Sequence, residues 1–172
     1  LSADAVMASA CLPALFQPVQ IENEYYWDGG FSGNPSIYPL IYATGSCDVV
    51  LVQINPIESA YTPGASAQEI MERVNEITFN APLLAEIRAI EFVRRLLAEG
   101  RLDPARYKNV LLHRVDGGAA LAEFGAASKS RADSAFIRRL FELGRATGHK
   151  WLRAHLRDVG VRSSAEQTDP SS

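Results

Sequence analysis

Apolar positions follow two patterns along the chain, and the pattern changes near residue 66. Before that point, short runs rich in Val, Ile and aromatic residues are separated by Gly, Pro and Asn. The run Asp48–Ile54 (DVVLVQI) is almost continuously apolar, which predicts a strand of a parallel sheet covered on both faces. The run Val19–Trp27, with Asn23 and Glu24 at its middle, predicts a short hairpin or two strand pieces.

Caps and helix breakers define the other N-terminal segments. The Ala-rich stretch Ser2–Ala10, with Ser2 as its cap, predicts a helix that Pro13 prevents from continuing. Residues Leu12–Pro18 then form an irregular connector, and Ile37–Thr44 forms a short helix. A loop is expected over residues 59–64.

From Ser66, which we expect to cap a helix, the spacing becomes helical. Pro82 divides this region, so we predict two helices, the second ending at Gly100. Their apolar positions recur every three or four residues: Ile70, Val74 and Ile77 before Pro82, and Leu83, Ile87, Ile90, Val93 and Leu97 after it.

The C-terminal part adds one strand and one helix to the prediction. Residues Asn109–Val115 (NVLLHRV) indicate the strand, and a helix begins near Asp133 or Ser134. The polar residues 163–172 predict a disordered tail. We therefore expect an α/β fold, with a sheet-containing core over residues 1–62 and a mainly helical extension over residues 63–162.

Composition limits the class of protein. The chain has 172 residues, of which 47% are apolar and 22% charged, as in ordinary globular domains. The net charge of -3 gives no electrostatic reason to expect a nucleic-acid partner. No apolar run approaches the roughly 18 residues that a membrane-spanning helix needs.

The cysteines and the first residue bear on location. Cys11 and Cys47 fit neither a disulfide framework nor a CxxC motif, so we expect two buried free thiols in a reducing compartment, which favours the cytoplasm. The chain begins at Leu1, within a helix-like stretch and without Met. We therefore expect a fragment, and any targeting signal upstream of it lies outside the sequence.

Chemistry is most readily expected at Asp28-Gly29-Gly30. A strand delivers Asp28 to a turn whose two glycines permit positive φ and leave space beside the carboxylate. A carboxylate held in this way can act as a general base. The tripeptide alone, however, favours a simple turn.

The longer context resembles the patatin-like phospholipases, which are lipid acyl hydrolases. The resemblance covers most of the chain and is strongest over residues 1–56. Further segments are similar to bacterial members that carry an extra C-terminal helical region: Trp27–Ile41, the strand VVLVQINP and the segment NEITFN at Asn75–Asn80. In order along the chain, the residues that carry it are Ser9, Ala10, Pro13, Phe16 and Pro18, then Asp28, Gly29 and Gly30, then Asn34 and Pro35.

The resemblance implies a three-layer patatin-type sheet fold and a Ser-Asp dyad. Asp28 would take the proton of a serine hydroxyl directly, with Gly29 and Gly30 completing the motif. Asn34 would cap the following helix beside Pro35. The implied substrate is a lipid acyl ester, and no metal or organic cofactor is expected.

One departure from the family pattern is large. The family's Gly-x-Ser-x-Gly nucleophile and glycine-rich oxyanion loop do not occur in the 172 residues. The nearest approaches, at Ser32 and Ser66, lack the second glycine in the required place. We therefore expect the nucleophile in a missing N-terminal half of the hydrolase core, and no activity from this chain alone.

The alternative is a non-catalytic helical interaction module in which Asp28 is only a turn residue. An encoded Gly-x-Ser-x-Gly upstream of Leu1 separates the two hypotheses.

Other candidate residues have simpler structural explanations. His113, His149 and His155 lack metal-ligand spacing, so structural roles are expected for them. A second Asp-Gly-Gly, beginning at Asp116, lacks the flanking prolines and is interpreted as a turn. A final set of residues on the predicted helices, Arg88, Arg94 and Arg95, either contacts anionic lipid at a membrane surface or forms solvated helix faces.

Overall fold

The computed structural model describes residues 2–13, 15–54, 57, 66–122, 124, 128 and 131–165. Helices and small sheets are mixed, as the predicted α/β class requires. In chain order the elements are α1 (Ala3–Ala8), β1 (Val19–Ile21), β2 (Glu24–Tyr26), the 3-10 turn η1 (Gly29–Phe31), α2 (Tyr38–Ala43), β3 (Asp48–Gln53), α3 (Ala67–Ala98), β4 (Leu111–Asp116), α4 (Gly118–Ala122), α5 (Ser134–His155) and the 3-10 turn η3 (Leu156–Asp158).

The N-terminal unit contains the predicted helix and hairpin. The Ser2 hydroxyl accepts a hydrogen bond from the backbone N–H of Ala5 and so caps α1. Strands β1 and β2 pair antiparallel, with Val19 opposite Tyr26. Glu22 occupies the turn between them with φ of 57°. Both sequence predictions for this region are confirmed, although α1 ends at Ala8 rather than at Ala10.

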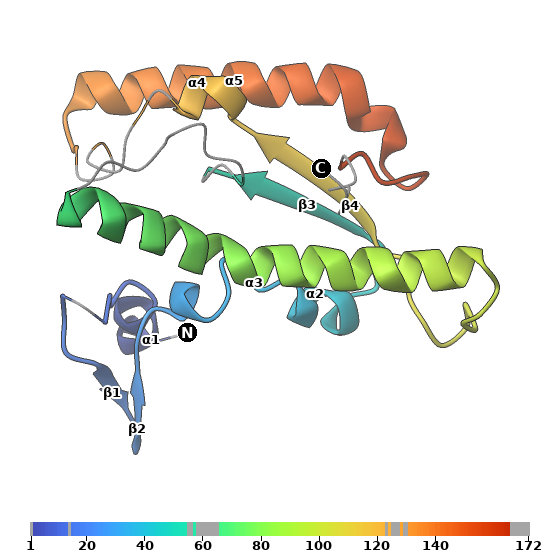
Figure 1. Cartoon of the computed structure of the whole chain (residues 1–172), viewed down its shortest axis with the longest axis horizontal. Coiled ribbons are helices and arrows are strands. Elements are labelled where there is room, and N and C mark those ends of the chain that lie inside the picture. Colours follow the sequence, from blue (N-terminus) through green and yellow to red (C-terminus); the bar gives the residue numbers. More distant parts are fainter. Residues whose placement is uncertain are drawn as a thin grey trace.

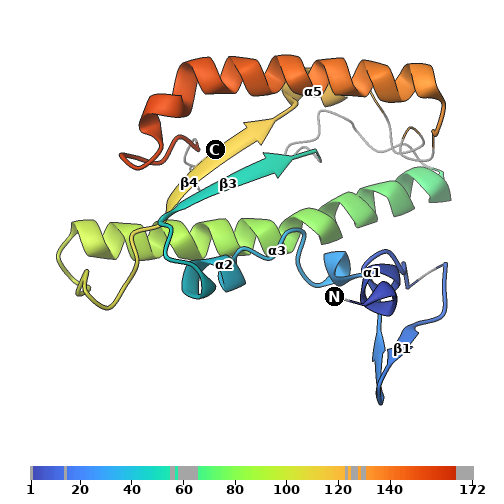
Figure 2. The same cartoon turned by 180° about the vertical axis from the view of Figure 1, so that it is seen from behind.

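The larger unit is a parallel pair, β3 and β4, connected by α3. Val49 lies opposite Leu112 in the register. Figure 1 shows α3 along one side of the pair and α5 along the other, and Figure 2 shows the same order of layers from behind. The core lies between the strands and α3; its buried members are Ile37, Leu51, Leu83, Ile87, Ile90, Val110 and Leu112.

The second face of β3 is open, contrary to the prediction that this strand is covered on both faces. Leu51 is 6% exposed, whereas Val50 is 50% and Val52 70% exposed. Residues alternate between the faces of a strand, so Leu51 points to α3, and Val50 and Val52 point to the opposite face. Helix α5 packs on β4 on that face. Among the described residues, β3 therefore keeps an exposed apolar face.

Helix α3 is continuous, so the prediction of two helices is wrong. Pro82 lies inside it. Proline lacks the N–H that would bond to the carbonyl of Thr78, which bends a helix without ending it. Figures 1 and 2 both show α3 changing direction partway along its length. Its N-terminus is the predicted one, because Ser66 and Glu69 form a reciprocal capping box.

Residues 163–165 are ordered, which corrects the expected start of the disordered tail. The Ser163 hydroxyl and the backbone N–H groups of Ser164 and Ala165 all donate to the carbonyl of Leu112. The remainder of that predicted tail, residues 166–172, lies outside the described residues, as does the expected loop at 59–64. The division into residues 1–62 and 63–162 stays a prediction, and the core cluster draws members from both sides of it.

The two thiols differ in exposure. Cys11 is buried, as expected, but Cys47 is exposed. Cys47 immediately precedes β3, at the edge of the core rather than within it. The prediction of two buried thiols is therefore wrong for Cys47.

Candidate active site around Asp28

The hairpin and the connector before it fix the position of Asp28. The residue follows β2 and caps η1, with its Oδ1 accepting a hydrogen bond of 2.8 Å from the N–H of Gly30. Its own N–H donates to the carbonyl of Cys11 at 2.9 Å. The neighbouring Trp27 Nε1 donates to the carbonyl of Phe16 at 3.1 Å. These hydrogen bonds join the segment before β1 to the end of β2, and so fix the position of the Asp28 carboxylate.

The Asp28 loop also packs on α3. The rings of Phe31 and Phe79 lie 5.2 Å apart, centre to centre. A Cβ on Gly30 would lie 3.1 Å from Asp28 Oδ1 and 3.3 Å from Phe79 Cε1, whereas a Cβ on Gly29 would meet nothing within 4 Å. The absence of a side chain at Gly30 therefore leaves room for the Asp28 carboxylate and the Phe79 ring of α3 to lie this close to the loop backbone.

The conformational role expected of these glycines is wrong. Among the described glycines, positive φ occurs at Gly100, Gly118 and Gly160 and not at Gly29 or Gly30. The Asp28 turn is a 3-10 turn with ordinary φ values, so what Gly30 contributes is space.

The surroundings of the carboxylate leave it available. Asp28 is half-buried, and within the described part of the chain it forms no salt bridge. A carboxylate with one oxygen held by an N–H and no cation beside it can accept a proton from a hydroxyl brought to its other oxygen. Asp28 thus lies at the end of strand β2, without an ion pair to any described arginine. The role as catalytic base stays a prediction.

The second Asp-Gly-Gly has the same hydrogen bond within its turn, although Gly118, unlike Gly30, has positive φ. Asp116 ends β4, and its Oδ1 accepts from the N–H of Gly118 at 3.0 Å. Unlike Asp28, it is exposed and lies 3.2 Å from Arg114 Nε. The hydrogen bond within an Asp-Gly-Gly turn therefore does not identify a base, and Asp116 provides a matched control for Asp28.

Asn34 does not cap the following helix, contrary to the expected role. Helix α2 has Ile37 at its N-cap, with no bond from that side chain. Glu86 of α3 provides the acceptor instead, with Oε2 at 2.5 Å from the N–H of Ile37 and 3.0 Å from that of Tyr38. The half-buried Asn34 precedes Pro35 in a cis peptide. No local sequence signal points to Glu86, which is 49 positions from Ile37.

A hydrogen-bonded chain of Asp48, His113 and Ser164 was not predicted. His113 Nε2 lies 2.9 Å from Asp48 Oδ1, and its Nδ1 lies 2.8 Å from Ser164 Oγ. Asp48 also accepts from the N–H of Gly160 at 2.7 Å. The Gly160 hydrogen bond, followed by that of His113, lowers the pKa of Asp48 from its ordinary 3.8.

This order of side chains is that of an acyl-transfer triad, but the site is closed. His113 is 0% exposed and packs against the Trp151 ring in a T-shaped arrangement, whereas Ser164 is half-buried. A general base must exchange protons with the reacting groups, and this imidazole has no surface open to a substrate or to water. The chain of bonds instead attaches the segment after α5 to the sheet, which is the structural role expected of His113.

The two remaining histidines, His149 and His155, lie on α5. His155 bonds to Asp158 at 3.0 Å, and His149 is exposed on α5. Within the described ranges, no group of three or more His, Cys, Asp or Glu side chains is arranged to hold a metal ion. None of the described helices combines the length and apolar character needed to cross a membrane.

Comparison with known proteins supports the N-terminal resemblance. Residues 1–41 match the family model described as patatin-like phospholipase. The matched part contains Asp28, Gly29, Gly30, Asn34 and Pro35, and relates this region to lipid acyl hydrolases. The resemblance is thus confirmed over residues 1–41. No curated protein and no solved structure matches the chain.

Proposed function

We propose, from the match of residues 1–41 to the patatin-like phospholipases, that this chain supplies the general-base part of a serine lipid acyl hydrolase. The observation that carries the proposal is the Asp28 carboxylate, which sits in the matched motif, half-buried and free of any cation in the described structure. Its substrate would be a lipid acyl ester.

In the proposed reaction, Asp28 accepts the proton of a serine hydroxyl as that oxygen attacks the ester carbonyl. Asp28 then gives this proton to the leaving alcohol, which departs and leaves an acyl-enzyme with the carboxylate ionised again. The carboxylate next accepts a proton from the attacking water and returns it to the serine oxygen as the fatty acid is released. The Gly30 N–H is bonded to Oδ1, which leaves Oδ2 as the acceptor of the serine proton.

The nucleophile and the oxyanion donors would come from a part of the hydrolase core outside these 172 residues, since no Gly-x-Ser-x-Gly occurs in them. The exposed face of β3 supports this proposal. Val50 and Val52 of β3 are 50% and 70% exposed, and Ile54, which follows the strand, is 72% exposed, whereas the other face of β3 packs in the core. Additional strands and helices of a larger sheet would cover such a face.

Three materials test the proposal: the coding sequence upstream of Leu1, the longer protein that it encodes, and the 172-residue chain alone. We expect an upstream Gly-x-Ser-x-Gly, labelling of that serine by a fluorophosphonate in the longer protein, and hydrolysis of a p-nitrophenyl acyl ester. The 172-residue chain alone should show neither labelling nor turnover above an Asp28→Ala control. A longer protein without the motif and without esterase activity would support the interaction module instead.

A further inference from the structure

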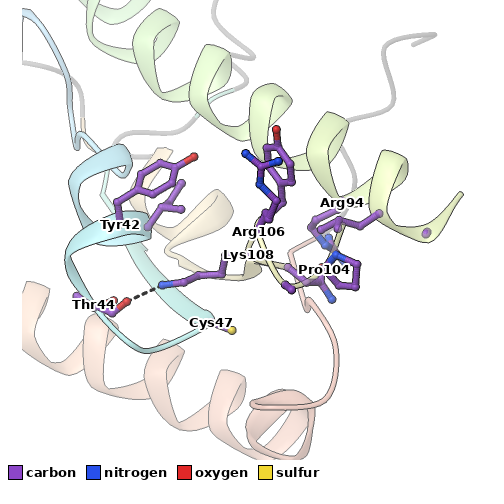
Figure 3. A pocket seen from close by; sticks show the side chains of 13 residues that line it. Tyr42, Thr44, Cys47, Arg94, Pro104, Arg106 and Lys108 are labelled. Atoms are coloured by element: carbon purple, nitrogen blue, oxygen red, sulfur yellow. Dashed lines mark hydrogen bonds between the residues drawn. The ribbon is translucent and has the colours of Figure 1, made fainter. Parts of the chain in front are cut away.

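A cleft of about 830 Å³ lies at the far end of α3 from Asp28. It is bounded by the end of α2, the start of β3, the last turns of α3 and the loop over residues 104–109 (Figure 3). Arg94 is 15 positions along α3 from Phe79, which contacts the Asp28 loop. At about 1.5 Å per residue this places the two regions about 20 Å apart. The cleft is therefore separate from the candidate active site.

The lining is cationic. Arg94, Arg106 and Lys108 all border the cleft, and no Asp or Glu is among its lining residues. Figure 3 shows these three side chains, together with those of Tyr42 and Pro104, around the cleft. Like charges gathered without a carboxylate repel each other, which favours occupation by an anion.

Two of these cations can interact with a ligand. Arg94 is half-buried at the cleft and forms no ion pair within the described residues, and its Nε, which lies out of contact with solvent, has no hydrogen-bond partner there. A half-buried guanidinium without a carboxylate partner is stabilised by an anion bound beside it. Lys108 Nζ donates to the carbonyls of Thr44 at 2.6 Å and Ser46 at 3.2 Å, which leaves its third N–H.

A smaller cavity of about 140 Å³ adjoins the cleft and shares Ile41, Tyr42, Tyr107 and Lys108 with it. It extends between α2 and α3, where its lining includes Ala89, Ile90, Val93 and Val110. Its one carboxylate, Glu86, is already bonded to the N–H groups of Ile37 and Tyr38. The cationic cleft thus continues into an apolar cavity.

We propose that the cleft and the cavity together bind an anionic amphiphile. A phosphate monoester group contacts Arg94, Arg106 and Lys108, and the adjoining hydrocarbon lies between Ile41 and Val93. Arginine forks match phosphate oxygens in pairs, and apolar surface favours an acyl chain over free phosphate. This proposal is independent of the hydrolase proposal, because no residue of the Asp28 loop lines either space.

Cys47 provides a direct readout, because it is exposed and borders the cleft whereas Cys11 is buried. Carbamidomethylation of Cys47 by iodoacetamide would be followed by mass spectrometry, together with calorimetric titration, on the 172-residue chain. The probes are dihexanoyl phosphatidic acid, dihexanoyl phosphatidylcholine and inorganic phosphate, all below micelle-forming concentrations. We expect phosphatidic acid to slow Cys47 modification and to bind at least tenfold more tightly than either other probe.

Variants distinguish the cleft from general surface charge. Arg94→Gln and Arg106→Gln should each weaken phosphatidic acid about tenfold or more, whereas Arg88→Gln, an exposed position on the same helix, should not. Arg106 is exposed on a loop, so its variant tests the site even if Arg94→Gln fails to fold.

Four results would overturn the proposal. Equal binding of inorganic phosphate would exclude the hydrocarbon part, and equal binding of phosphatidylcholine would exclude the anionic part. Weakening by Arg88→Gln equal to that by Arg106→Gln, or no binding of any probe, would exclude the site.

Discussion

The substitution Gly30→Ala tests the packing of the Asp28 loop on α3, with Gly29→Ala as its neighbouring control. The added Cβ at residue 30 would lie 3.1 Å from Asp28 Oδ1 and 3.3 Å from Phe79 Cε1, so carboxylate and ring must each move by a few tenths of an ångström. Overpacking of this kind costs about 1–3 kcal/mol. The loss of unfolded-state entropy returns about 0.4–1 kcal/mol.

We therefore expect Gly30→Ala to lower the free energy of unfolding by about 1–2 kcal/mol. Gly29→Ala adds a Cβ that meets nothing within 4 Å at an ordinary φ, so it should be neutral or stabilising by up to about 1 kcal/mol. For a chain of this length, each kcal/mol shifts Tm by about 2–4 °C.

Urea and thermal unfolding followed by circular dichroism measure both variants. The described packing of the Asp28 loop on α3 is contradicted if Gly30→Ala is as stable as the unsubstituted chain. It is also contradicted if Gly29→Ala loses as much stability as Gly30→Ala. Either result would mean that the loop does not approach α3 as closely as described.

Two further predictions concern the core and the acid range. Leu83→Ala, at a position 1% exposed, should cost about 2–5 kcal/mol in urea unfolding, whereas Ile77→Ala, at a position 54% exposed on the same helix, should cost far less. Asp48 has a lowered folded pKa, so its contribution is present above the ordinary 3.8 and is lost as pH falls through the folded value. Asp48→Asn should therefore lower Tm at pH 7. Between about pH 4 and pH 2, the Tm of this variant should fall less than the Tm of the unsubstituted chain. An equal fall of Tm in the two proteins would contradict this prediction.

The elements that local patterns define were predictable. The cap at Ser66 depends on Glu69 three positions away, and the strand over residues 48–53 depends on a contiguous apolar run. The resemblance over residues 1–41 likewise rests on a motif of neighbouring residues. In each case, the residues that determine the feature lie within a few positions of one another.

The features that sequence reasoning missed depend on contacts between distant segments. Glu86 caps α2 across 49 positions, and Ser164 reaches His113 across 51. Pro82 was expected to end a helix, but α3 packs along the sheet on one side of the core, and tertiary burial of Leu83 and Ile87 outweighs one lost hydrogen bond. The cation-lined cleft brings residue 47 next to residues 94 and 106, which no spacing in the sequence indicates.

The proposed role of Asp28 is tested most directly by comparing Asp28→Asn with Asp116→Asn in a longer protein that includes the proposed nucleophilic serine. Both substitutions remove a carboxylate from an Asp-Gly-Gly turn while keeping an oxygen for the turn's N–H. The measurement is fatty-acid release from a phospholipid, with circular dichroism to verify folding. We predict that Asp28→Asn lowers kcat by several powers of ten and that Asp116→Asn leaves it nearly unchanged. Near-normal activity of folded Asp28→Asn, or an equal loss in both variants, would contradict the assignment of Asp28 as the base.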